Sequence, residues 1–135
     1  MENRPFSDIS FEAFLTEGKL MGSRCGHCGK HYVPPRPICP GCHGTQMDWV
    51  EMSGKGKLAA FTCIAIGPAA MIAEGYDRHN PYCSAVIELD EGARVDARLE
   101  GIDPKKPEEI DVGMPLKVKY GHRVDKRTYL AFEPL

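Results

Sequence analysis

Hydrophobic and polar positions first predict a short helix near the start of the chain, in residues 10–20 (SFEAFLTEGKL). The apolar side chains that would share one helical face are Phe11, Phe14 and Leu15. The candidate N-cap residues are Ser7, Asp8 and Ser10. Gly18 is typical of a helix end. Because so short a helix is unstable alone, its apolar face must pack on the rest of the chain or on a partner.

From about residue 48 onward the pattern is that of β-strands. Segment 57–66 (KLAAFTCIAI) is apolar at successive positions, as in a strand buried on both faces. The further predicted strands are 83–90, 93–100, 115–120 and 128–134. Residues 91–92 (EG) suit a short hairpin turn, and Gly54 and Gly56 lie where a long first strand must bend sharply. Together these strands predict a small closed antiparallel barrel or a sandwich.

Between these regions, residues 22–47 show no period long enough for a helix or a core strand. The segment has too little apolar material to fold by burial, so a bound metal is the expected substitute. The chain is therefore predicted to comprise an N-terminal helical segment (1–21), a metal-binding segment (22–47) and a barrel (48–135).

Four cysteines in the middle segment have the spacing of a metal site, C-x2-C-x10-C-x2-C. They are Cys25, Cys28, Cys39 and Cys42. Each pair can wrap one side of an ion, and two facing pairs complete a tetrahedron. Zinc is the predicted metal and iron of a rubredoxin type is the main alternative. Four thiolates leave no open position for water, which indicates a structural role.

Several neighbours of the four cysteines have simpler interpretations. Gly29 and Gly44 follow the two pairs, where a tight turn favours positive φ. An extended arm, from Tyr32 through the prolines at 34–37, is expected to connect the pairs. The three nearby histidines are expected at the surface or outside the ligand set: His27, His31 and His43. Tyr32 and Trp49 are expected to pack between the metal-binding segment and the barrel.

Composition limits the possible functions. Hydrophobic residues make up 42% of the chain and charged residues 27%, which is typical of a globular protein. A net charge of −2 gives no general attraction to nucleic acid or anionic membranes. No apolar run is long enough to span a bilayer, and the first residues lack the pattern of a secretory signal. The cytoplasm is the expected compartment. There a disulfide framework is not expected, so Cys63 and Cys83 are interpreted as small packed residues.

A nucleic-acid-binding function is the main alternative from another class. Residues 19–47 contain four Lys or Arg and no Asp or Glu, and the expected footprint is Arg24, Lys30 and Arg36. Four charges are few for such a site, and the barrel lacks a row of aromatic residues interleaved with basic ones. This alternative predicts a module for single-stranded nucleic acid.

Taken in order, several motifs resemble a known family. The motifs are GKL (18–20), RCGHCG (24–29), PPRPICPGC (34–42), WVEMSGKGK (49–57), PYCSAVIELDEG (81–92) and VGMPLKV (112–118). Together they resemble the zinc-ribbon plus OB-fold family of acyl-CoA-associated proteins, and the resemblance covers nearly the whole chain. It implies a mainly β protein: a short N-terminal helix, a rubredoxin-like zinc ribbon and a five- or six-stranded OB-fold barrel.

The resemblance also implies an accessory role, with the four ribbon cysteines as zinc ligands. Members of the family accompany thiolase-type enzymes, or acyl-CoA hydratases or aldolases, as small subunits in hetero-oligomers. The expected function is that of a non-catalytic subunit that docks near the CoA channel of a partner and can contact its CoA thioester. No Ser/His/Asp or Cys/His arrangement with a recognisable context is present, so no catalytic residue is assigned.

One loop departs from the family pattern, GPAAMIAEGYDRHNP at 67–81. It is long for a connection between strands, and long ordered loops are often functional. The residues predicted to face a partner or acyl-CoA are Met71, Ile72, Tyr76, Arg78 and His79. A surface loop without a partner is the simpler alternative.

Overall fold

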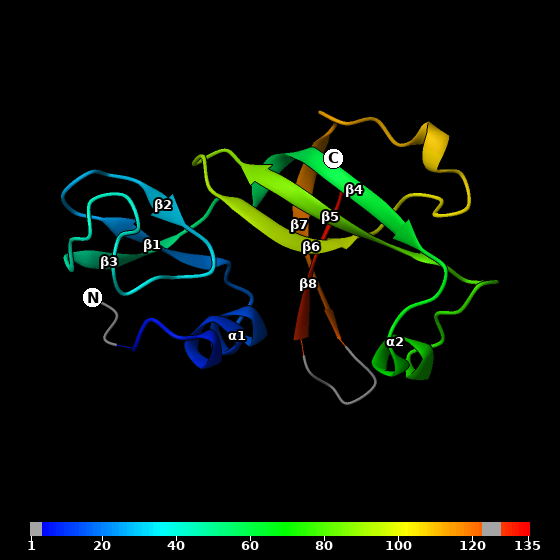
Figure 1. Ribbon diagram of the computed structural model, residues 1–135, viewed down its shortest axis with the longest axis horizontal. Helices are drawn as coiled ribbons and strands as arrows, with labels where there is room; N and C mark the ends of the chain where they lie inside the picture. The colour runs from blue at the N-terminus through cyan, green and yellow to red at the C-terminus, as the bar shows by residue number, and fades with distance from the viewer. Residues whose placement is uncertain (1–3, 123–127) are drawn as a thin grey trace.

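A three-stranded sheet and a closed barrel lie side by side in the computed structural model, which describes residues 4–122 and 128–135 (Figure 1). The elements of the sheet region are α1 (Asp8–Thr16), β1 (Met21–Cys25), β2 (His31–Tyr32) and β3 (Met47–Glu51). Those of the barrel region are β4 (Lys55–Ile64), α2 (Ala69–Ala73), β5 (Tyr82–Leu89), β6 (Arg94–Leu99), the 3₁₀ turn η1 (Pro107–Glu109), β7 (Pro115–His122) and β8 (Thr128–Pro134). The predicted mainly β fold is confirmed.

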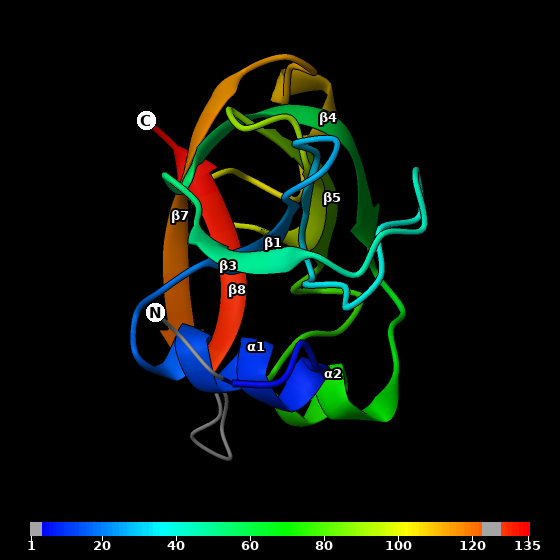
Figure 2. The same ribbon diagram turned by 90° about the vertical axis from the view of Figure 1, so that its left-hand side faces the viewer.

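The barrel closes in the order β4-β5-β6-β8-β7, and Figure 2 shows it with the sheet in front. All neighbouring pairs are antiparallel except β6 and β8. At Gly56 strand β4 pairs with both β5 and β7, and a Cβ there would lie 2.5 Å from the carbonyl oxygen of Glu88. Because it has no side chain, Gly56 allows β4 to lie close to β5 where the barrel closes. This agrees with its predicted position at a sharp bend.

The barrel core is built from the inward side chains of alternating strands. Strand β5 alternates buried and half-buried positions along its whole length, as predicted for 83–90. Fully buried core side chains include Leu58, Ile87, Leu89, Leu116 and Phe132. A continuous apolar interior of this kind supplies the barrel with its own folding free energy.

Strand β4 is not buried on both faces, which corrects the prediction for 57–66. Its register with β5 shifts between Leu58 and Ala60. A bulge of this kind adds one residue and switches which positions face inward. Leu58 before the bulge and Phe61 and Cys63 after it all pack on the core. The run of apolar residues thus reflects a change of face rather than burial on two sides.

The three-stranded sheet has the order β2-β1-β3, and its strand β3 is followed along the chain by β4 of the barrel. Its short strands β1 and β2 were not predicted, because their few residues carry no extended alternation. Leu20, Val33 and Met52 belong to the same core cluster as the barrel residues. The amide of Arg36 donates to the buried Ser23 Oγ (2.8 Å), which fixes the proline arm on β1. The sheet is thus anchored to the barrel at one end.

Helix α1 forms where the apolar pattern predicts it, with Ser7 as N-cap. The Ser7 side chain accepts a hydrogen bond from the amide of Ser10 (3.3 Å). Phe14 packs against the ring of Trp49 with 5.0 Å between ring centroids. The indole Nε1 of Trp49 donates to the carbonyl oxygen of Arg4 (2.8 Å). Trp49 thus holds the N-terminal segment against β3. In the part of the chain that the structure describes, no helix is long and apolar enough to cross a membrane.

Candidate metal centre and docking surface

The four predicted metal-ligating cysteines meet at one point. All their Sγ atoms lie within 4.8 Å of one another, and two of the separations are 3.5 Å, Cys25–Cys42 and Cys28–Cys39. Zinc with Zn–S bonds of about 2.3 Å in a tetrahedron gives S–S edges of about 3.8 Å. The donor set therefore fits a single tetrahedral zinc ion. Among the described residues, no histidine or carboxylate belongs to this cluster.

Each cysteine pair lies in a tight turn closed by a backbone hydrogen bond. The amide of Gly29 donates to the Cys25 carbonyl, and the amide of His43 donates to the Cys39 carbonyl, both at 2.8 Å. Gly29 has φ +78° and His43 has φ +62°. The prediction of a positive φ is confirmed at Gly29, but in the second turn His43 adopts it instead of Gly44. Gly29 and His43 are equivalent, because each directly follows the second cysteine of its pair.

Hydrogen bonds to sulfur favour thiolates in the buried half of the site. The Tyr32 Oη lies 3.2 Å from the Cys39 Sγ, within hydrogen-bond distance, and the phenol is the donor when the sulfur is a thiolate. That bond, followed by bonds from the backbone amides of Cys42 and Gly41, lowers the pKa of Cys39 to about 5. The same contact raises the pKa of Tyr32 to about 12. Backbone amides, first that of Cys28, likewise lower the pKa of Cys25. Thiolates are the form that binds metal.

The contact of Tyr32 was missed by sequence reasoning, which placed it between the ribbon and the barrel. Its side chain packs in the small cluster of Cys25, Cys39 and Met47 at the cysteine site. The spacing of the cysteines gives no signal for this contact. An aromatic residue in the arm between two metal-binding turns was the only hint.

The 67–81 loop contains the short helix α2 and folds back onto the barrel. Met71 is 9% exposed, and its Sδ lies 3.4 Å from a guanidinium nitrogen of Arg98 on β6. Arg98 also pairs with Glu74 at 2.9 Å, and both side chains are largely buried. Tyr76 packs edge to face on Tyr82 with centroids 5.4 Å apart. Met71 and Tyr76 therefore attach the loop to the barrel.

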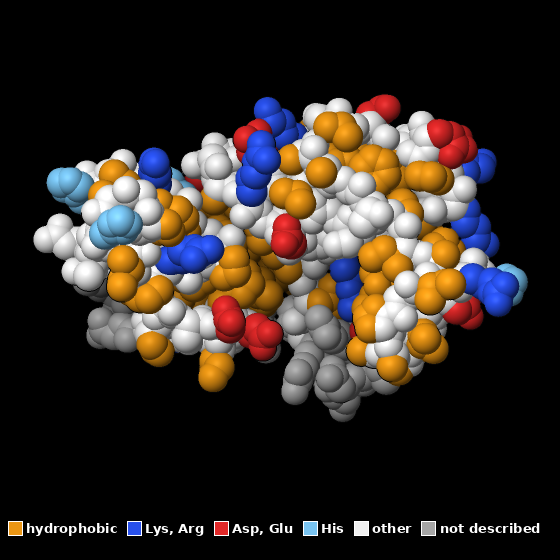
Figure 3. Space-filling model, in the orientation of Figure 1, with side chains coloured by type: hydrophobic (Ala, Val, Ile, Leu, Met, Phe, Trp, Pro, Cys, Tyr) orange, Lys and Arg blue, Asp and Glu red, His pale blue; other side chains and the backbone are white. Residues whose placement is uncertain are grey.

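The other predicted interaction residues point outward. Ile72 is 56% exposed, and Arg78 and His79 are also exposed. Figure 3 shows hydrophobic side chains gathered over α2. Residues 64–73 (IAIGPAAMIA) contain no charged side chain, and Ile66 is 84% exposed. This uncharged stretch, residues 64–73, is called the α2 surface below.

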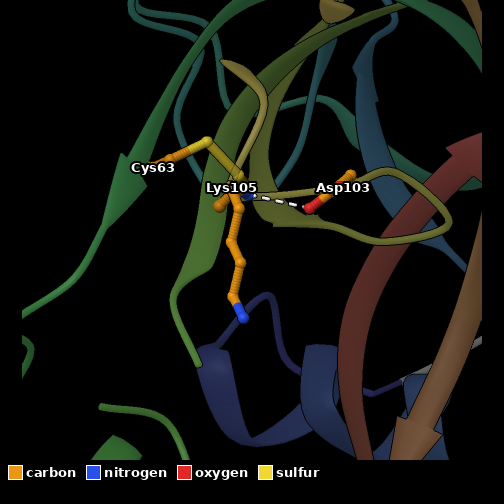
Figure 4. The surroundings of a disulfide bond; sticks show 4 residues. Cys63, Asp103 and Lys105 are labelled. Atoms are coloured by element: carbon orange, nitrogen blue, oxygen red, sulfur yellow. Dashed lines mark hydrogen bonds between the residues drawn. A yellow bond between two sulfur atoms is a disulfide. The ribbon is translucent and has the colours of Figure 1, made fainter. Parts of the chain in front are cut away.

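Cys63 and Cys83 form a disulfide, which corrects their interpretation as unlinked packed residues (Figure 4). They are direct cross-strand partners on β4 and β5, at the two ends of the loop that carries α2. Near the bond, the amide of Lys105 donates to the Asp103 carboxylate (2.9 Å). The prediction failed because the two cysteines come into register only when the strands pair.

A cavity of about 400 Å³ lies beside the disulfide at this end of the barrel. Its lining includes Cys83, Arg98, Lys119 and Tyr129. Glu100 accepts from the Tyr129 hydroxyl (2.5 Å) and pairs with Lys119 (3.0 Å). Burial, and then this hydrogen bond, raises the pKa of Tyr129 to about 12. The charged side chains that line the cavity are thus paired with one another or with neighbouring residues, which is typical of a structural network.

The ribbon with four converging thiols and the closed barrel together define a zinc-ribbon protein with an OB-fold. The description "ChsH2, rubredoxin-like zinc ribbon domain" matches residues 13–48, and "ChsH2, C-terminal OB-fold domain" matches residues 49–120. The chain therefore belongs to the ChsH2 family of zinc-ribbon and OB-fold proteins, which confirms the resemblance.

Relatives and solved structures agree with this assignment. A "DUF35 domain-containing scaffold protein" of Methanocaldococcus jannaschii is 34% identical over 75% of this chain and 67% of its own length. The "benzoylsuccinyl-CoA thiolase subunit BbsA" of Thauera aromatica is 38% identical over 61% of this chain and 52% of its own length. The structure titled "Ltp2-ChsH2(DUF35) aldolase" superposes with a TM-score of 0.78 and 27% identity, covering 99% of this chain and 98% of that one.

Proposed function

We propose that this chain is a non-catalytic scaffold subunit of an acyl-CoA-processing complex, and that its partner is a thiolase-type enzyme. The observation that carries the proposal is the family membership of the whole chain, together with relatives named as a scaffold protein and as a thiolase subunit. The similarity to the aldolase structure supports the coarser statement that the partner is an acyl-CoA enzyme, and keeps an aldolase as the second candidate. A relative named as a probable enoyl-CoA hydratase alpha subunit adds a hydratase to that candidate class.

The metal part of the proposal is one structural zinc ion per chain. Cys25, Cys28, Cys39 and Cys42 would hold it, and the geometry of their Sγ atoms supports this. Zinc supplies the cross-link that the apolar residues of 22–47 cannot provide. On this proposal the ribbon holds α1 and the barrel in one fixed arrangement, and the reacting groups belong to the partner.

The α2 surface is proposed as the part of the barrel that docks on the partner near its CoA channel. Exposed apolar residues gathered on one element are typical of protein-binding sites. Ile66 and Ile72 lie in the exposed part of this surface, and Arg78 and His79 follow it in sequence. The buried Arg98–Glu74 pair keeps the surface in place before a partner binds.

The test is affinity purification of the tagged chain from its own host, with the co-purifying proteins identified by mass spectrometry. The expected result is an acyl-CoA thiolase whose thiolysis activity falls when the gene for this chain is deleted. Ile72→Asp should weaken the complex at least tenfold. Val112→Asp is the matched control, because Val112 is also apolar and is 64% exposed, but lies between η1 and β7 and not in the α2 surface.

Three outcomes decide between the candidates. Recovery of an aldolase or hydratase would replace the thiolase by the second partner class. Recovery of nucleic acid that is released at moderate salt would favour the module for single-stranded nucleic acid. Elution of the chain alone, with unchanged thiolysis after deletion, would contradict the scaffold function altogether.

A further inference from the structure

The buried thiol of the metal site has a side-chain hydrogen-bond donor of its own. The Oη of Tyr32 lies 3.2 Å from the Sγ of Cys39, within the range of a hydrogen bond to sulfur. Cys39 is fully buried, so its sulfur cannot obtain an equivalent bond from bulk water. Tyr32 reaches this position because β2 pairs with β1, with Tyr32 opposite Ser23. The donor is therefore fixed by the sheet and not by a flexible loop.

A cation lies on the same side of the site. A Cβ built on Gly41 would lie 3.3 Å from the Lys30 Nζ, 3.6 Å from the Tyr32 Oη and 3.7 Å from the Cys39 Sγ. The ammonium, the phenol and the thiol thus surround one point beside Gly41. A Cβ at position 41 would be in ordinary contact with the phenol and the thiol, and would press only on the Lys30 ammonium.

The charge of the loaded site explains why these two groups matter. Four thiolates around one Zn²⁺ leave a net charge of −2. Water can balance this charge at the exposed Cys28 and Cys42 but not at the buried Cys25 and Cys39. A hydrogen bond to an ionised acceptor is stronger than one to a neutral acceptor. Groups that contact metal ligands in this way typically change metal affinity by about 10–100-fold when removed.

We propose that Tyr32 and Lys30 are positioning residues that retain the zinc ion, with Tyr32 donating to the Cys39 thiolate and Lys30 balancing its charge. The inference rests on the proposed structural zinc site and adds to it the residues that slow its loss. On this proposal, Cys39 is protected from losing the ion by the hydrogen bond from Tyr32, which the exposed Cys28 and Cys42 do not receive.

The experiment uses the full zinc-loaded chain and follows the release of zinc to an excess of a chromogenic chelator. Tyr32→Phe keeps the ring and removes the donor, and it should release zinc about 10–100-fold faster than the unmodified chain. Lys30→Gln should have a smaller effect in the same direction. Tyr82→Phe is the matched control, because it removes a phenol from the barrel strand β5.

A second measurement keeps the test independent of the release rate. Timed alkylation with iodoacetamide and peptide mass spectrometry gives the rate at each cysteine of the loaded chain. At reaction times shorter than zinc release, Tyr32→Phe should accelerate the alkylation of Cys39 more than that of Cys25, whereas general loosening of the ribbon or loss of zinc would accelerate both equally. Because Lys30 is exposed, Lys30→Gln still tests the idea if Tyr32→Phe does not fold.

The outcomes separate this inference from the proposed zinc site. If the unmodified chain holds one zinc ion and both variants release it at the unmodified rate, the positioning role is wrong and the zinc site stands. Equal acceleration at Cys25 and Cys39 also contradicts the role. If the unmodified chain holds no zinc under metal-replete expression, the proposed site fails and this inference fails with it.

Discussion

The metal-binding end of the ribbon and the barrel are stabilised in different ways. At the ribbon end, the buried cluster comprises only Cys25, Cys39 and Met47, with Phe6 and Tyr32 packed against it. The barrel has a continuous core that includes Leu58, Ile87, Leu116 and Phe132. An apolar core supplies free energy in proportion to the area it buries, so the barrel can fold by burial whereas the cysteine turns depend on a bound ion.

The boundary between the part stabilised by an apolar core and the part that depends on an ion does not coincide with the boundary between sheet and barrel. Leu20, Val33 and Met52 lie in the sheet region but are part of the barrel core. Part of the ribbon is thus held by burial, and on the proposed zinc site only the end carrying the cysteine turns needs metal. The proposed ion would therefore need to stabilise only the two turns, 25–29 and 39–43.

The largest expected effect is the loss of a metal ligand. Cys25→Ser should reduce bound zinc from one ion per chain to none and unfold the cysteine turns, because structural zinc contributes about 10–16 kcal/mol in comparable peptides. Metal analysis by mass spectrometry and far-ultraviolet circular dichroism would measure both. His43→Ser is the control, since His43 lies outside the ligand set, and should leave zinc bound. Full zinc content in Cys25→Ser would refute the ligand assignment.

The next effect concerns the barrel alone. Phe132→Ala removes a fully buried ring from β8 and should lower the free energy of unfolding by about 3–5 kcal/mol. Urea unfolding measures the change, and zinc content should stay at one ion per chain. Val112→Ala, an exposed position, should change stability by less than about 0.5 kcal/mol. Loss of zinc from Phe132→Ala would mean that the two regions do not fold independently.

A smaller effect is expected from the disulfide. It links residues 20 positions apart, and such a cross-link typically stabilises a protein by about 2–4 kcal/mol by restricting the unfolded chain. The double variant Cys63→Ala/Cys83→Ala should lose this amount in urea unfolding while keeping zinc. In unreduced chain denatured with chelator, four thiols should react with an alkylating agent, and six after reduction. Six reactive thiols before reduction would show that the bond is absent.

The amphipathic helix and the alternating strands could be predicted from sequence because their signals are local. Segment 83–90 was predicted as a strand, and β5 occupies Tyr82–Leu89. Strand β1 was missed because its few residues carry no extended alternation and its pairing with β3 joins residues distant in sequence. The interpretation of 57–66 failed because a bulge is invisible in a pattern of apolar residues.

In the candidate site, too, the features with local sequence signals could be predicted and those that depend on strand pairing could not. The cysteine spacing alone predicted that four thiols would meet at one point, and they do, since each pair is a local turn. The contact of Tyr32 with Cys39 depends on the pairing of β2 with β1, and the disulfide depends on the β4–β5 register. For the 67–81 loop, sequence could not separate the buried Met71 from the exposed Ile72, because both are apolar and adjacent.

Hydrogen exchange followed by mass spectrometry, with and without a zinc chelator, tests most directly that metal holds the turns and burial holds the barrel. Loaded chain should protect the amides of Gly29 and His43, which close the two turns, as well as those of β5. After chelation, the turns should exchange at least tenfold faster, while β5 keeps its protection. Equal loss of protection in the turns and in β5, or no change in the turns, would contradict the account.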